Sequence, residues 1–126
     1  MAKLSRKKTL LIKKETSYGS TSSPTGSANA VLVRDLTVEP VVSDEVSRDL
    51  IRGYLGNQEV LLANTRVNVS FDVEMAGSGT AGTAPKYSDA LLACGLALTT
   101  VSSTSNSYAP VSSSFDSVTI KYNTDG

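Results

Sequence analysis

The sequence predicts a mainly β domain that carries one α-helix, and three observations lead to this prediction. Residues 66–75 alternate polar and apolar side chains over ten positions without a break. Because successive side chains of a strand point to opposite faces of a sheet, we expect a half-buried strand here. Residues 30–39 and 116–122 are further strand candidates, and the helical spacing is confined to residues 86–94.

The first 28 residues differ in composition from the rest, and we expect a basic flexible N-terminal arm with a Ser/Gly linker (1–28) before a folded β domain (29–126). The arm carries six basic and no acidic residues up to position 14, whereas the remaining 112 residues carry 6 basic and 12 acidic ones. Such a block indicates a solubilising tail, docking on an acidic surface, or nucleic-acid binding. No aromatic residue lies between the basic ones to stack on bases, which weakens the last alternative. The basic residues are Lys3, Arg6, Lys7, Lys8, Lys13 and Lys14.

The middle of the chain predicts strands and one unusually apolar connection. We expect the strand over 30–39 to stop at Pro40, because proline cannot donate to a strand ladder. Residues 41–50 fit either a second strand or a helical turn capped by Ser43. The connection over 53–65 is too apolar for a solvated loop, so it is either a contact site or folds back on its own core. Its apolar residues are Tyr54, Leu55, Val60, Leu61 and Leu62.

A glycine-rich segment over 77–84 leads to the predicted helix at about 86–94. Pro85 suits the first helical turn, and Gly95 is a natural stop. The expected apolar face includes Cys94, which we interpret as a small packed hydrophobe. Strands are expected over 96–101, 108–111 and 116–122, with a polar turn over 102–107. Val118, Ile120 and Tyr122 share one face of the last strand.

The C-terminus predicts a hairpin that is not completed. Asp125-Gly126 after an alternating strand is a strong hairpin signal, yet no returning strand follows it. We expect either that the natural chain continues, or that the edge of the strand over 116–122 is covered in another way. An uncovered edge is a template for pairing with another chain.

The residues argue against an enzyme and predict no cofactor and no metal. The chain has no histidine and a single cysteine, so the usual triad base and a cysteine zinc site are both missing. The segment Gly77-Ser-Gly-Thr-Ala-Gly82 lacks the lysine of a phosphate-binding loop, which favours a flexible connection. Asp72 and Glu74 share a strand face and are expected to form a solvated acidic surface. No apolar run approaches a signal core or a membrane span, so we expect a cytoplasmic product with no membrane partner.

Several stretches in order resemble the tail tube (major tail) proteins of long-tailed bacteriophages and prophages, over roughly residues 15–126. None of the matching pieces is catalytic, so the resemblance implies an architecture and a role rather than a reaction. The matching pieces are Tyr18-Gly with the following Ser-Pro-Thr-Gly, Ala28-Asn-Ala-Val-Leu-Val-Arg-Asp-Leu-Thr-Val-Glu-Pro40, Arg48-Asp-Leu-Ile-Arg-Gly-Tyr-Leu-Gly56, Val69-Ser-Phe-Asp-Val-Glu-Met-Ala-Gly-Ser-Gly-Thr-Ala-Gly-Thr-Ala-Pro85, Leu91-Leu-Ala-Cys-Gly-Leu96, Tyr108-Ala-Pro-Val-Ser and Ser117-Val-Thr-Ile-Lys-Tyr-Asn-Thr-Asp-Gly126.

The resemblance implies a β-sandwich or barrel with one flanking α-helix. It also implies a structural virion protein that assembles with itself, as stacked and usually hexameric rings, and with other tail proteins. The resulting tube passes DNA without specific binding, after synthesis in the host cytoplasm. On this reading the basic arm, the apolar residues of 53–65 and the edge residues of 116–122 contact neighbouring subunits, and Asp72 and Glu74 face the lumen.

Three alternatives to a tube-forming protein remain open on the sequence. A tail-completion or neck protein shares the fold but forms a single ring. A virion-associated β-sandwich module, such as a decoration domain, is a monomer whose segment 53–65 binds a separate target. A DNA-binding protein would depend on residues 1–14 and would bind DNA in a salt-sensitive manner.

Overall fold

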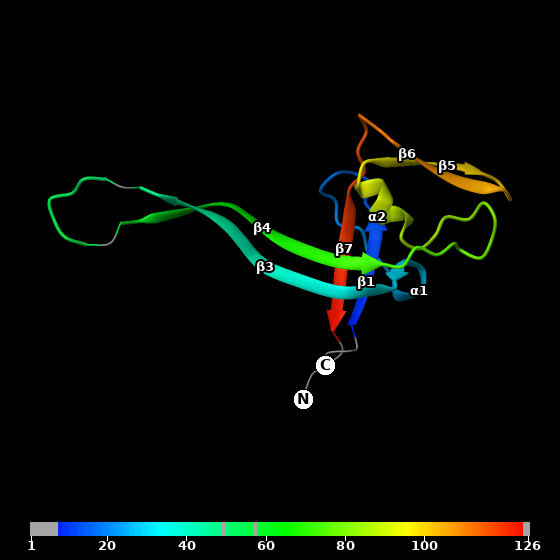
Figure 1. Cartoon of the computed structure of the whole chain (residues 1–126), viewed down its shortest axis with the longest axis horizontal. Helices are drawn as coiled ribbons and strands as arrows, with labels where there is room; N and C mark the ends of the chain where they lie inside the picture. The colour runs from blue at the N-terminus through cyan, green and yellow to red at the C-terminus, as the bar shows by residue number, and fades with distance from the viewer. Residues whose placement is uncertain (1–7, 49, 57, 125–126) are drawn as a thin grey trace. The chain divides into compact units, whose positions relative to one another are not determined.

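The computed structural model describes residues 8–48, 50–56 and 58–124, which divide into two compact units. Unit 1 combines both ends of the chain (Met1–Val33 and Val73–Gly126), and unit 2 is the intervening segment Arg34–Asp72. Both units are built mainly from strands, so the prediction of a mainly β, sandwich-like fold is confirmed. Figure 1 shows unit 2 as the ribbon of β3 and β4.

The core of unit 1 is a three-stranded antiparallel sheet in the order β2-β1-β7. Its central strand is β1 (Lys8–Lys14), flanked by β2 (Ala30–Val31) and β7 (Val118–Thr124). The hydrophobic residues that are buried among the described ones are Leu10, Leu11, Ile12 and Val31. Adjacent residues of a strand face opposite sides, so three consecutive buried residues mean that both faces of β1 are covered.

The expectation of a flexible arm is wrong for residues 8–14. They form the most buried strand of the described chain, with Leu10 and Ile12 exposed by only 0% and 1%. The run from Thr9 to Ile12 is apolar without alternation, which is the pattern of a strand buried on both faces. Residues 1–7 lie outside the described part of the chain.

The predicted helix is confirmed as α2 (Ser88–Ala93), and a short additional helix, α1 (Gly26–Asn29), was not expected. α2 packs against β1, β5 and β7 within unit 1. It ends at Ala93, and Gly95, directly after the C-cap, has a φ of +83°, a conformation that favours glycine. Cys94 at the C-cap is exposed, so the interpretation of this thiol as a packed hydrophobe is wrong.

A second antiparallel hairpin follows α2. It consists of β5 (Leu96–Val101) and β6 (Ser105–Pro110), in register so that Leu98 faces Tyr108. The strand predicted over 96–101 is therefore confirmed, while the turn is shorter than expected and Ser105 already belongs to β6. The Tyr108 hydroxyl donates a 2.7 Å hydrogen bond to Ser88 Oγ and so ties the hairpin to the start of α2.

Unit 2 is a long two-stranded ribbon of β3 (Val33–Ser47) and β4 (Val60–Val73). Pro40 does not stop β3, so that expectation is wrong. Of the two alternatives for residues 41–50, the strand is confirmed up to Ser47, as part of β3, and no helical turn begins at Ser43. A two-stranded ribbon has an outer edge on each strand, where a proline removes no ladder bond. The predicted strand over 66–75 is confirmed up to Val73, and β4 begins earlier than expected, at Val60.

Unit 2 has no hydrophobic core of its own among its described residues. Every residue that is buried in the described chain lies in unit 1. Some apolar side chains of the ribbon are half-buried, such as Val38 and Phe71, and others are exposed, such as Val41 (70%) and Val67 (59%). An isolated two-stranded hairpin is marginally stable at best in water.

Residues 125 and 126 are outside the described part of the chain, so the expected terminal hairpin turn stays a prediction. Among the residues that the structure describes, neither helix is long and apolar enough to cross a membrane.

Candidate assembly surfaces

The basic residues predicted to contact other subunits are not gathered on one arm. Lys3, Arg6 and Lys7 fall outside the described residues, and Lys8, Lys13 and Lys14 lie on β1. Lys13 Nζ donates to the carbonyl oxygen of Ser23 at 3.3 Å. Lys13, and Lys14 as described next, are therefore used within unit 1 itself, two of the three described lysines of β1.

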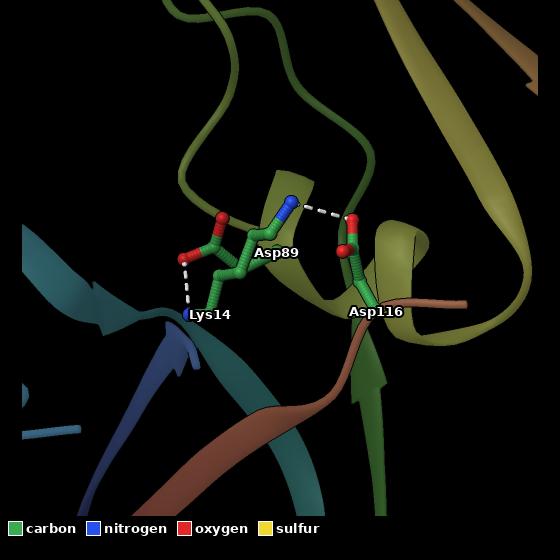
Figure 2. Close-up of polar contacts among 3 residues, drawn as sticks. All are labelled: Lys14, Asp89 and Asp116. Atoms are coloured by element: carbon green, nitrogen blue, oxygen red, sulfur yellow. Dashed lines mark hydrogen bonds and ion pairs between the residues drawn. The ribbon is translucent and has the colours of Figure 1, made fainter. Parts of the chain in front are cut away.

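Lys14 links three elements of unit 1, as Figure 2 shows. Its ammonium group forms a 2.7 Å ion pair with Asp116 Oδ2, just before β7, and its backbone N–H donates to Asp89 Oδ2 of α2 at 3.0 Å. The Lys14 and Asp116 side chains keep 47% and 29% of their surface exposed, so solvent screens the ion pair. The contact positions α2 on the sheet. Because solvent screens the charges, its contribution to the stability of unit 1 comes more from this positioning than from electrostatic attraction.

Glu15 forms a second polar cluster, between the end of β1 and the start of β7. Its carboxylate accepts hydrogen bonds from the Ser117 hydroxyl at 2.7 Å, the Thr119 hydroxyl at 2.8 Å and the Gly19 N–H at 3.1 Å. These donors, the Ser117 hydroxyl foremost, lower the pKa of Glu15 from its usual value. The Ser22 N–H also donates to the Thr119 hydroxyl at 3.0 Å, so the cluster fastens the loop after β1 onto β7.

The predicted edge strand is present as β7, but one of its edges is already used. β7 pairs with β1 along its length, with Ile12 opposite Ile120 and Leu10 opposite Tyr122. Its other edge has no strand partner among the described residues. Ile120 and Tyr122 are exposed by 39% and 40%, and Val118 is half-buried. β7 therefore offers one edge and partly uncovered apolar side chains.

The apolar residues expected in one loop are divided between the turn and the strand of unit 2. Val60, Leu61 and Leu62 begin β4, where they are exposed by 46%, 43% and 64%. Tyr54 and Leu55 lie in the turn, which we call the hairpin tip (residues 50–56 and Gln58). These side chains are exposed in the described chain, and they do not lie in one loop as expected. Their role as subunit contacts stays a prediction.

The two acidic residues expected to face a lumen are both exposed. Asp72 is the penultimate residue of β4, and Glu74 directly follows that strand. They carry a local negative charge at the point where the chain passes from unit 2 to unit 1.

The glycine-rich segment, which the sequence predicts to be a flexible connection, is held by close contacts and hydrogen bonds. Gly82 has a φ of +73°, and a Cβ built on it would lie 2.5 Å from the Ser103 backbone nitrogen. The Ser78 hydroxyl donates to the Thr83 carbonyl oxygen at 2.8 Å. The segment thus packs closely on the turn between β5 and β6. Within the described residues, no group of three or more His, Cys, Asp or Glu side chains is placed to hold a metal ion.

Sequence reasoning missed the Glu15 cluster and the fully exposed Ile51 of the hairpin tip. No local pattern reports a bond such as Glu15 to Ser117, because the partners lie 102 positions apart. Ile51 carried a signal, since it follows Leu50 in an otherwise polar stretch.

A comparison with known proteins identifies the family to which this architecture belongs. The model of a family described as phage tail tube protein matches residues 5–126, which is nearly the whole chain. The chain belongs to the phage tail tube protein family. No curated protein and no solved structure gave a significant match.

Membership of the tail tube family makes the chain a structural protein of the bacteriophage tail. The resemblance found in the sequence is therefore confirmed. Proteins of this family are generally not enzymes, and their place is the tail of the virion. The matched range includes β1, so the strand mistaken for an arm belongs to the domain that defines the family.

Proposed function

We propose that the chain assembles with copies of itself into stacked hexameric rings that form the tube through which phage DNA passes. The observation that carries the proposal is unit 2, a ribbon with no buried side chain among its described residues, in a member of the tail tube family. A marginal ribbon with exposed apolar faces gains stability when other subunits cover it. Assembly into hexameric rings, as in the family resemblance, supplies that cover.

Lateral contacts within a ring are proposed at β7. Its edge without a strand partner in the described chain can accept a strand from a neighbouring subunit. The partly exposed Ile120 and Tyr122 add apolar surface beside the backbone hydrogen bonds. The remaining edges of the short β5–β6 hairpin offer less apolar surface, because β6 is rich in serine and asparagine.

The conduit is proposed to present acidic side chains to the DNA, with Asp72 and Glu74 lining it. A passing DNA must slide, and neutralisation of phosphates by Lys or Arg is what creates tight non-specific binding. The double variant Asp72→Lys with Glu74→Lys should slow DNA ejection while tubes still form. Glu45→Lys with Glu59→Lys reverses the same number of exposed charges elsewhere and serves as the control. Equal ejection rates in both variants would contradict the lumen assignment.

Electron microscopy of the purified protein over a range of concentrations tests the assembly. We expect long tubes with a regular axial repeat. Single rings that never stack would indicate a tail-completion or neck protein instead. A monomer at every concentration would indicate a virion-associated module that binds a separate partner, and it would overturn the proposal.

A further inference from the structure

Unit 1 contains a cleft beside the glycine-rich segment that the proposed function does not use. Its volume is about 430 Å³, within the range of roughly 300–1,000 Å³ that small-molecule sites occupy. Residues 77–83 form one part of its lining, and Pro85, Tyr87, Asn106 and Tyr108 form the rest. We call it the tyrosine cleft. All of its lining residues belong to unit 1, and none of them belongs to β7 or to the acidic pair proposed for the conduit.

The lining of the tyrosine cleft contains no charged side chain. Residues 75–115, which include the whole lining, carry only two charged side chains, Lys86 and Asp89, although 19% of the complete chain is charged. Both are engaged elsewhere in unit 1. Lys86 Nζ donates to the Ala28 carbonyl oxygen at 2.8 Å, and Asp89 Oδ2 accepts from the Lys14 N–H at 3.0 Å. A ligand in the cleft therefore meets no full charge in the lining.

The cleft instead offers hydrogen-bond donors that have no partner within the described chain. The backbone N–H groups of Gly79 and Ala81 donate to no other described residue. Asn106 Oδ1 accepts from the Thr100 hydroxyl at 2.8 Å, which leaves the N–H groups of the same amide for a ligand. The Tyr87 hydroxyl is likewise unpaired among the residues that the structure describes. Oxygen atoms of a ligand can satisfy all of these donors.

The lining is ordered by hydrogen bonds of its own. The Ser78 hydroxyl lies 2.9 Å from the Thr80 carbonyl oxygen and 2.8 Å from that of Thr83, and the Thr83 N–H donates to the Thr80 carbonyl oxygen at 3.2 Å. The Tyr108 ring is held by the bond of its hydroxyl to the buried Ser88. A site whose groups are already ordered loses less conformational entropy when a ligand binds.

The chemistry of the lining selects among classes of ligand. A nucleic acid or another anion would be recognised by Lys or Arg, which this lining lacks. A purely apolar ligand would cover the unpaired N–H groups without accepting their hydrogen bonds, which costs free energy for each buried donor. A neutral polyhydroxylated ligand meets both conditions. Each of its hydroxyl groups can donate and accept, and its C–H groups can lie against tyrosine rings.

We propose that the tyrosine cleft binds a neutral carbohydrate. The rings of Tyr87 and Tyr108 contact the apolar face of a sugar, and the Asn106 amide and the N–H groups of Gly79 and Ala81 donate to its oxygen atoms. The site does not depend on how copies assemble, because its whole lining lies within one unit of one chain. It adds a binding role to the structural one.

NMR titration of the isotope-labelled full chain tests the site. The probes are glucose, as a free sugar, and maltotetraose, cellotetraose and chitotetraose, as fragments of neutral glycans, with inorganic phosphate as the anionic control. We expect at least one sugar to bind with a Kd below about 1 mM and to shift the amide resonances of Gly79, Ala81 and the Asn106 side chain.

The probes also identify the source of the ligand. A tetrasaccharide that binds more tightly than glucose identifies a polymeric glycan, and equal binding identifies a free sugar. The proposal is overturned if no sugar reaches this affinity, if the shifted resonances lie outside the cleft, or if phosphate binds there as tightly as the best sugar.

Tyr87→Leu tests the aromatic contact, and Tyr18→Leu is its matched control. Tyr18 is a 94% exposed tyrosine of unit 1 that does not line the cleft. We expect Tyr87→Leu to raise the Kd of the best sugar by roughly tenfold, because the ring that covers the sugar is lost, and Tyr18→Leu to leave it unchanged. An equal change in both variants would mean that the sugar binds outside the cleft.

Ala81→Leu is a second variant, in case the replacement of Tyr87 disturbs the start of α2. Ala81 is exposed and lines the cleft, so a leucine there narrows the cleft without replacing a packed side chain. The Kd should rise by roughly tenfold while the Tm stays that of the parent protein. Ala93→Leu, on an exposed alanine of α2 outside the cleft, is the control. An unchanged Kd for Ala81→Leu would contradict the proposal.

Discussion

Glu15 joins segments of unit 1 that are far apart in sequence, and its bonds make the stability of the unit dependent on pH. The Ser117 and Thr119 hydroxyls and the Gly19 N–H all donate to the ionised carboxylate. The pKa of Glu15 is therefore below its usual value, with the Ser117 bond as the largest cause. A carboxyl whose pKa is lowered in the folded state stabilises the fold above the unfolded pKa of about 4.3, and this stabilisation is lost as the pH falls through the folded value.

We expect Glu15→Gln to reduce this acid sensitivity. The variant should have a lower Tm than the parent protein at pH 7, because an amide accepts weaker hydrogen bonds than a carboxylate. The difference should shrink as the pH falls below about 4, where the parent loses the same interaction. Thermal unfolding between pH 7 and pH 3 measures both effects. Glu74→Gln is the matched control, and a difference for Glu15→Gln that stays constant across this range would refute the argument.

Gly82 is the glycine whose replacement should cost most among those in the segment 77–84. A Cβ at this position would meet the Ser103 nitrogen at 2.5 Å and the Val101 carbonyl oxygen at 2.9 Å, and neither backbone atom can move cheaply. Gly79 has a similar φ of +81° but open space around it. We expect Gly79→Ala to cost about 1 kcal/mol for conformation alone and Gly82→Ala about 2–3 kcal/mol. Chemical denaturation measures the two free energies of unfolding, and equal losses would contradict the close approach.

At the scale of elements, β1 holds unit 1 together. It pairs with β2 and β7, contacts α2, and supplies the three most buried aliphatic side chains of the described chain. We expect Ile12→Ala to reduce the free energy of unfolding by about 2–4 kcal/mol through lost burial and a residual cavity. Val101→Ala, on a 52% exposed residue of β5, should change it by less than about 1 kcal/mol. A small effect of Ile12→Ala in equilibrium denaturation would mean that β1 is not the core.

The same strand shows what sequence patterns predict and what they do not. Strands exposed on one face, such as 66–73, were identified because alternation is a local signal. The helix and its glycine stop were identified for the same reason. β1 was missed because a short apolar run says nothing about its partners, and its pairing with β7 joins residues more than 100 positions apart. Pro40 was misread because the cost of a proline depends on whether its strand has an outer edge.

The candidate contact surfaces were only partly predictable for a related reason. Uncovered apolar residues such as Leu55 are visible in a sequence as hydrophobes in a polar, turn-rich stretch. Their uncovered state follows only from the fold, since the same residues could have packed on the domain's own core. The basic residues at the N-terminus illustrate the opposite case, in which Lys13 and Lys14 are used for internal contacts.

For the molecule as a whole, stability is divided unequally between the two units. Unit 1 contains every buried residue of the described chain, whereas the described side chains of unit 2 are half-buried or exposed. Local opening free energies follow such differences in burial, so the two units should respond differently to dilution. We expect the amides of residues 34–72 to exchange with deuterium within seconds in dilute protein, while those of β1 and β7 exchange many orders of magnitude more slowly.

Assembly should remove this difference, because copies that cover the ribbon also protect its backbone. Hydrogen exchange with mass spectrometry on dilute and assembled samples measures the change, and β5–β6 peptides serve as an internal reference within unit 1. The protection gained by residues 34–72 should exceed that gained by the reference by at least tenfold. Strong protection of the ribbon in dilute monomer would mean that the hairpin is stable by itself, and the main physical reason for expecting self-assembly would then be lost.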